Sequence, residues 1–208
     1  MVTKWTAADL NALADLLLAT TLAGLRGDIS LTPETIAALK RLPALGSFAC
    51  RVGPGSNLEL LKELPRIRWL VLIGDATQPR AIPPVVWADI GARKLQALEL
   101  NGISIDDEAA KRIAGLELIG EQLLSLIDCP GTHTRLNVLA KGTAHILSIG
   151  DKNLTDSDVP RLAAFKTLKE LNFWSDGLTE PGVKSLSEKM PDCRITWKER
   201  TFGKAPKK

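Results

Sequence analysis

The chemistry most readily suggested by the sequence involves Cys129 and His133, which lie four residues apart. A thiol beside an imidazole is the arrangement of cysteine nucleophiles, in which the imidazole removes the thiol proton. No third group that would orient the imidazole can be identified, and the motifs HExxH, GxSxG and GxxxxGK[ST] do not occur. His133 is better interpreted as a solvated turn residue, and the second histidine, His145, falls in a strand-like segment. We therefore predict no catalytic residues and no enzymatic activity.

Anion and metal sites are equally weakly indicated. The run Gly-Pro-Gly-Ser at 53–56 precedes a helical pattern, where backbone N–H groups could meet an anion. No lysine follows as in a phosphate-binding loop, so a turn followed by a helix cap is the favoured interpretation. Cys50, Cys129 and Cys193 are odd in number, far apart and without CxxC spacing, which favours buried apolar residues over disulfides or zinc ligands. We expect no metal and no cofactor.

A repeated apolar pattern organises most of the chain. Its template is LxxLxL, five further residues, then Leu-Thr and a short helical pattern, and it is clearest at 144–155 and 168–179. The residues Ile29-Ser-Leu31-Thr32 form a degenerate first copy, and Ile195-Thr-Trp197 matches the end of a closing strand. The six clear copies begin at Leu45, Ile67, Leu95, Glu121, Ala144 and Leu168, which are spaced by 22, 28, 26, 23 and 24 residues.

The template has a direct structural meaning. Alternating apolar residues predict a short strand with one buried face, and the 3.6-residue spacing after the threonine predicts a helix of a few turns. One such unit cannot bury enough apolar surface alone, so each copy must stack on its neighbour. We therefore predict an α/β solenoid in which a curved parallel sheet lines the inside and short helices cover the outside.

The ends of the chain differ from its middle. We divide the sequence into an N-terminal capping helix (1–28), a repeat domain with a closing strand (29–197) and a basic C-terminal tail without periodicity (198–208). In the first segment, Thr6 precedes an amphipathic pattern that contains Leu10, Leu13, Leu17 and Leu18. Within the repeats, we predict helix caps at Thr32, Asp106, Thr155 and Thr179, and a capping box over Ser56-Asn-Leu-Glu59.

Charge and hydropathy exclude several classes of protein. The 208 residues are 25% charged and 45% apolar with a net charge of +3, which excludes extensive disorder and argues against a dedicated nucleic-acid binder. No apolar run of about 18 residues is present to span a membrane. Asp9, Asn11 and Asp15 interrupt the N-terminal apolar stretch, so an export signal is not indicated. We expect a cytoplasmic protein, and the tail is more typical of a solubilising segment than of a phosphate contact.

The template resembles that of leucine-rich-repeat proteins over about residues 30–197. Leu-Thr followed by an acidic residue is similar to the ribonuclease-inhibitor-like and cysteine-containing subclasses, and bacterial members often end in a motif resembling Met190-Pro-Asp-Cys-Arg-Ile-Thr-Trp197. The resemblance implies a right-handed solenoid whose concave sheet commonly binds other proteins. The ninth template position departs from the Asn, Cys or Thr of many members, which implies a less regular arc. The residues at that position are Gly53, Asp75, Ile103, Cys129-Pro130, Lys152 and Asp176.

The concave face is the candidate binding surface. Template positions three, five, seven and eight should face the hollow of the arc, where an apolar stripe beside an acidic margin would fit a partner with basic and apolar features. Two alternatives are that another segment covers these residues or that the assignment slips by one position. The predicted partner-binding residues are Trp69, Val71, Ile73, Glu99, Asn101, Leu123, Ile127, Asp128, Ile146, Asp151, Glu170, Asn172 and Trp174. Of these, Glu99, Asp128, Asp151 and Glu170 make up the acidic margin.

Function is therefore predicted from this surface and not from a catalytic motif. The favoured hypothesis is a non-catalytic protein–protein interaction module whose partner the sequence does not name. A self-associating scaffold is the first alternative, and a repeat domain that serves as a bacterial effector or as an enzyme-inhibitor subunit is the second. An enzyme or a nucleic-acid binder is the least favoured.

Overall fold

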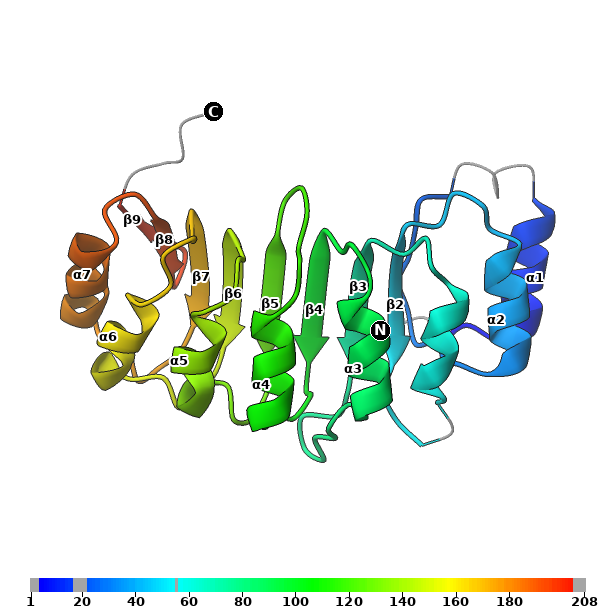
Figure 1. Cartoon of the computed structure of the whole chain (residues 1–208), viewed down its shortest axis with the longest axis horizontal. Coiled ribbons are helices and arrows are strands. Elements are labelled where there is room, and N and C mark those ends of the chain that lie inside the picture. Colours follow the sequence, from blue (N-terminus) through cyan, green and yellow to red (C-terminus); the bar gives the residue numbers. More distant parts are fainter. Residues whose placement is uncertain (1–3, 17–21, 55, 204–208) are drawn as a thin grey trace.

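One sheet of nine strands runs through the whole structure. The computed structural model describes residues 4–16, 22–54 and 56–203. The strands follow one another in chain order; β1 to β8 are parallel, and β9 is antiparallel to β8 (Figure 1). The strands are β1 (Gly24–Leu25), β2 (Ser47–Arg51), β3 (Trp69–Ile73), β4 (Ala97–Asn101), β5 (Leu123–Ile127), β6 (Ile146–Gly150), β7 (Glu170–Trp174), β8 (Arg194–Trp197) and β9 (Arg200–Phe202).

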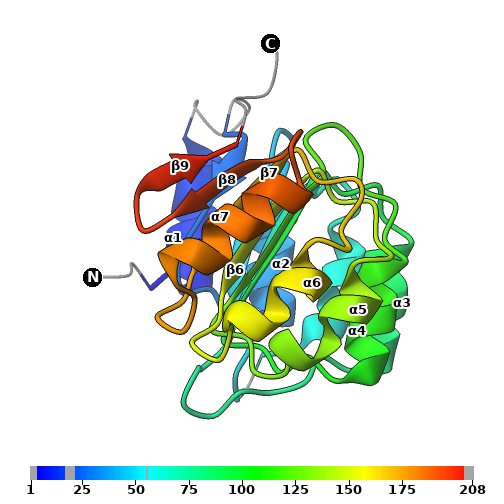
Figure 2. The ribbon, with the colours of Figure 1, turned by 90° about the vertical axis from the view of Figure 1, so that its left-hand side faces the viewer.

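Short helices alternate with the strands. Figures 1 and 2 show α3, α4, α5 and α6 side by side along one face of the sheet, and no helix of the described chain covers the other face of β3 to β7. We call this other face the open face. The helices are α1 (Ala7–Asp15), α2 (Pro33–Lys40), η2 (Leu58–Glu63), α3 (Pro84–Gly91), α4 (Asp107–Ala114), η3 (His133–Arg135), α5 (Leu136–Leu139), η4 (Asp156–Asp158), α6 (Val159–Leu162) and α7 (Glu180–Lys189).

The strand register confirms the alignment of the sequence copies. Residues at template positions four and six pair with their counterparts on each neighbouring strand, and all of them are buried in one continuous core. The position-four row is Phe48, Leu70, Leu98, Leu124, Leu147, Leu171 and Ile195. A repeating β–α unit therefore builds the sheet, an arrangement compatible with a repeat solenoid.

Most predicted helix caps are present. The side chains of Thr32 and Asp106 accept hydrogen bonds from the backbone N–H groups of Thr35 and Ala109, at 3.3 and 2.7 Å. Thr179 likewise accepts from the N–H of Gly182 at 3.4 Å. At Thr155 the main contact runs the other way, because its N–H donates to the Asp158 carboxylate at 3.1 Å. These bonds satisfy N–H groups that the first helical turn leaves free.

The predicted capping box at Ser56 is wrong. Asn57 caps η2 instead, accepting from the N–H of Glu59 at 3.1 Å. The Ser56 hydroxyl accepts from the N–H of Leu31 at 3.1 Å, so it joins two repeats. Because η2 begins at Leu58, the residue in the cap position is Asn57 and not Ser56.

The two ends differ partly from expectation. The N-terminal helix α1 begins after Thr6 and buries Leu10, whereas the predicted Leu17 and Leu18 contacts lie outside the described residues. The first repeat contains a strand of only two residues, β1, that the sequence pattern did not predict.

At the other end, the expected irregular tail instead contains β9. Lys198 and Glu199 adopt left-handed backbone angles (φ 47° and 64°), which allows a two-residue turn between β8 and β9. The rest of the predicted tail, 204–208, is outside the described residues.

Within the described chain, every helix is too short or too polar to cross a lipid bilayer.

Candidate functional site

The open face carries three rows of side chains, set by the strand register. Side chains at template positions four and six lie in the core, so those at positions three, five and seven lie on the open face, as predicted. A slip of the assignment by one position is therefore excluded for these strands. The first row is Ser47, Trp69, Ala97, Leu123, Ile146, Glu170 and Arg194; the middle row is Ala49, Val71, Glu99, Ser125, Ser148, Asn172 and Thr196; the third row is Arg51, Ile73, Asn101, Ile127, Gly150 and Trp174.

Exposure across these rows is uneven. Trp174 is 55% exposed, whereas Trp69, Ile127 and most of the other predicted binding residues on the strands are half-buried. Two expectations of exposure are wrong: Val71 is only 4% exposed and Asp151 only 6%. Val71 lies in the middle row between Ala49 and Glu99 and is flanked on its own strand by Trp69 and Ile73, so a position facing the open side does not by itself give a solvent-exposed side chain.

Asp151 is buried because it stabilises a turn. Its carboxylate accepts from the N–H of His133 at 3.2 Å and from both the N–H and the side-chain amide of Asn153, at 2.9 and 3.1 Å. A carboxylate with its oxygens satisfied in this way holds two loops together at the end of the sheet. Asp151 is thus a structural residue and not part of an exposed acidic margin.

The other carboxylates of the predicted acidic margin are mostly paired within the chain. Glu99 pairs with Arg26 at 3.0 Å, and Glu170 lies 3.9 Å from Arg194. Only Asp128 is exposed and without an ion pair among the described residues. The expectation of an open acidic margin is therefore corrected: basic side chains of the chain itself offset its charge.

A hollow opens at the carboxyl ends of β5, β6 and β7. Its volume is about 340 Å³, and its centre is Gly150, which pairs with Ile127 on one side and Trp174 on the other. Because glycine has no side chain, the third row is interrupted there and the two large apolar side chains become walls. The lining is completed by Asp128, Asp151, Lys152, Ser175, Asp176 and Lys198.

The rim of this hollow carries charges of both signs. Asp176 pairs with Lys198 at 3.5 Å, and the Lys198 ammonium also lies 4.9 Å from the ring centre of Trp197. A second hollow of about 260 Å³ shares Asp128 and Lys152 with the first and continues along the same edge of the sheet. The site is therefore an apolar depression whose rim carries three aspartates and two lysines.

The Cys129–His133 pair does not have the properties of an activated nucleophile. The Cys129 thiol donates to the carbonyl oxygens of Leu100 and Ile127, at 3.2 and 3.3 Å. Burial raises the pKa of this thiol to about 11, so it stays protonated at neutral pH. The imidazole Nδ1 of His133 instead lies 3.4 Å from the Asp151 carboxylate.

The other two cysteines are buried as predicted, and both are free thiols. Desolvation raises the pKa of Cys50 to about 12 and that of Cys193 to about 11. In the described part of the chain, no group of three or more His, Cys, Asp or Glu side chains is arranged to hold a metal ion.

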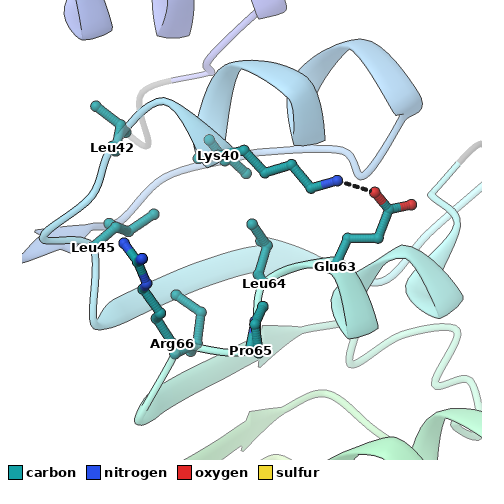
Figure 3. Close-up of a pocket in the computed structure, with 9 residues that line it drawn as sticks. Lys40, Leu42, Leu45, Glu63, Leu64, Pro65 and Arg66 are labelled. Carbon is teal, nitrogen blue, oxygen red and sulfur yellow. Dashed lines mark hydrogen bonds and ion pairs between the residues drawn. The ribbon is translucent and has the colours of Figure 1, made fainter.

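A separate pocket lies near the amino ends of β2 and β3, whereas the hollow lies at the carboxyl ends of β5, β6 and β7. Its volume is about 240 Å³ (Figure 3). Leu42, Leu45 and Leu64 contribute apolar walls, and an ion pair between Lys40 and Glu63 bounds one side. No predicted binding residue lines this pocket.

Sequence reasoning missed two important features of the open face. Arg26 was not considered because the first repeat is degenerate, so the template did not align its residues with the sheet. Gly150 was assigned to the open face, but the hollow that its missing side chain leaves was not predicted. The available signal was a glycine in a column where the aligned residues of neighbouring copies are Ile127 and Trp174.

Comparison with models of known protein families finds no match for the chain. A search of curated proteins likewise finds no matching relative.

Proposed function

We propose that the repeating units form a right-handed solenoid of the leucine-rich-repeat class. Support comes from strands in strict chain order, separated by 22 to 28 residues, with helices packed along one face. Parallel strands joined through helices are right-handed in nearly all proteins. Because helices are wider than strands, stacking such units bends the sheet and makes the open face concave.

We further propose that this face binds a protein partner and has no catalytic role. The observation that carries the proposal is the hollow above Gly150, walled by Ile127 and by the exposed Trp174. Large apolar side chains exposed beside a depression are typical of contact surfaces, and tryptophan is enriched among residues that dominate binding energy. The partner would insert an apolar side chain into the hollow and cover the indole ring.

The mixed charges of the rim affect which partner fits. Lys198 and Asp176 pair with each other, and the remaining charged residues of the rim are Asp128, Asp151 and Lys152, so the net charge is small and gives only weak attraction for a strongly charged protein. Rim charges mainly set orientation and the rate of association. We therefore favour a partner whose apolar side chain is flanked by polar groups of both signs, in place of the partner with basic and apolar features that the sequence indicated.

The alternative of self-association through the sheet edge is less well supported. The C-terminal edge is β9, which has three residues and begins with Arg200, and Lys198 lies in the turn before it. Short edge strands with basic side chains disfavour pairing with another sheet edge. Light scattering over a range of concentrations should give the mass of a single chain, and a mass that doubles with concentration would favour the scaffold hypothesis.

Capture from an extract of the source cell tests the proposed surface. Trp174→Ala removes one wall of the hollow, and Gly150→Val fills its centre. A Cβ added at Gly150 would lie 3.1 Å from the Ile127 Cγ2 methyl, so the Ile127 side chain must shift, and circular dichroism of the variant checks that the fold is retained. Val85→Ala is the matched control, because Val85 is also 55% exposed but lies on α3, away from the open face.

The expected result is a protein captured by wild type and by Val85→Ala but lost with both open-face variants. Retention of the same protein by Trp174→Ala and Gly150→Val would contradict the proposed site.

A further inference from the structure

Arg26 reaches across the open face from β1 to β4. It follows Leu25, which pairs with Phe48, and its guanidinium lies 3.0 Å from the Glu99 carboxylate. Neighbouring strands are about 4.8 Å apart, so the side chain and Glu99 together bridge roughly 14 Å. The residues between them in the middle row are Ala49 and Val71, which are small and buried.

The end of this arm rests in a site that Trp69 and Glu99 form together. Trp69 Nε1 donates to Glu99 Oε1, the same oxygen that accepts from Arg26 Nη2. The guanidinium carbon of Arg26 lies 5.8 Å from the ring centre of Trp69, within the range of a cation–π contact. The indole thus both orients the carboxylate and faces the cation, which is the chemistry that recognises a guanidinium group.

Arg26 is weakly held in this site. Its side chain is 60% exposed, and the strand that precedes it has only two residues. Exposed ion pairs contribute little to stability, because water and salt screen them and ordering a long side chain costs entropy. An arginine from a bound protein could replace it at small cost, since the interface would exclude water from the same contacts.

We propose that Trp69 and Glu99 form an arginine-binding site, occupied by Arg26 in the free protein and by an arginine of the partner in the complex. The inference rests on the proposed protein-binding function and adds the chemistry of one partner side chain. It also gives Glu99 and Trp69, both predicted binding residues, a specific role at the N-terminal half of the face. In the complex, displacement of the arm would uncover Ala49 and Val71 for apolar contact.

The site can be tested without the partner. The probe is N-acetyl-L-arginine amide, and the readout is the indole N–H resonance of Trp69, assigned with Trp69→Phe. Arg26→Ser vacates the site, and Arg26→Gln is a second vacating variant that keeps most of the arm. An exposed ion pair of about 1 kcal/mol corresponds to a fivefold competition, so the probe should bind roughly five times more tightly to either variant than to wild type.

Matched controls separate this site from general electrostatics. Arg51→Ser removes the same charge from the open face but leaves Arg26 in place, because Arg51 pairs with Asp28. It should bind the probe as wild type does. N-acetyl-L-citrulline amide, the neutral analogue, should not shift the Trp69 resonance, and adding Glu99→Gln to Arg26→Ser should abolish the tighter binding.

Equal probe affinity in wild type and both vacated variants would overturn the proposal, as would unchanged binding after Glu99→Gln. Failure of the probe together with successful open-face capture would refute only the arginine site. Probe binding as expected, with partner capture insensitive to Trp174→Ala and Gly150→Val, would refute the proposed hollow and leave the arginine site standing.

Discussion

Two adjacent residues of β7 should lose very different amounts of stability on truncation. Phe173 is 1% exposed and lies in the core row, whereas Trp174 is 55% exposed and lies on the open face. Phe173→Ala loses the burial of a whole ring and leaves a cavity, which typically costs about 3–5 kcal/mol. For Trp174, roughly half of an area of about 200 Å² stays in water in the folded protein, which at 25 cal/mol per Å² sets an upper limit near 2.5 kcal/mol.

Urea unfolding followed by far-ultraviolet circular dichroism measures both effects. With a slope of about 2 kcal/mol per M, the Phe173→Ala midpoint should fall by roughly 1.5–2.5 M and the Trp174→Ala midpoint by well under 1.3 M. Should Phe173→Ala not fold, Phe173→Leu and Trp174→Leu allow the same comparison at smaller amplitude. A larger loss for Trp174 than for Phe173 would refute the assignment of the two faces.

Three further perturbations test contacts between repeats. Hydrogen bonds from Thr179 lower the pKa of Asp156, so the ionised Asp156 carboxylate stabilises the fold at pH values above its unfolded pKa. The difference in unfolding free energy between wild type and Asp156→Asn should therefore vanish as the pH falls below about 4. Urea unfolding from pH 7 to 2.5 measures this difference. Hydrogen bonds from Arg200 are the largest cause that lowers the pKa of Glu180 to about 2, so in Arg200→Gln the NMR-monitored titration of Glu180 should move toward 4.5 and β9 amides should exchange faster. Arg93→Met removes a buried guanidinium that donates to two backbone carbonyls of the preceding repeat and should cost about 3 kcal/mol in thermal unfolding, whereas a loss below 0.5 kcal/mol would contradict that role.

The repeat rows could be predicted because burial imposes a strict pattern on the sequence. Leu147 and Leu171 must occupy equivalent positions in neighbouring coils, since a shift by one residue would turn every core side chain to solvent. That constraint acts on each copy and therefore survives the variation in copy length. It also fixed which residues face the open side.

The terminal strand β9, the burial of residues on the open face and the hollow do not follow from the repeat pattern, because they depend on turn geometry and on contacts between distant residues. β9 depends on a turn in which Lys198 and Glu199 take left-handed angles, without the Gly or Asn that usually signals such a turn. The burial of Val71 depends on its neighbours in three dimensions, and the hollow depends on what Gly150 lacks. Ion pairs such as that of Arg26 with Glu99 join residues from distant copies, and no local sequence pattern predicts them.

Site-specific photocrosslinking tests the central claim most directly. A photoreactive phenylalanine analogue placed at Asn101, in the third row of the open face, is compared with the same group at Val85 on the helical side. In extracts of the source cell, the proposed function predicts one protein crosslinked from Asn101 and absent from Val85. A partner that crosslinks from Val85 and not from Asn101 would contradict the assignment of binding to the open face.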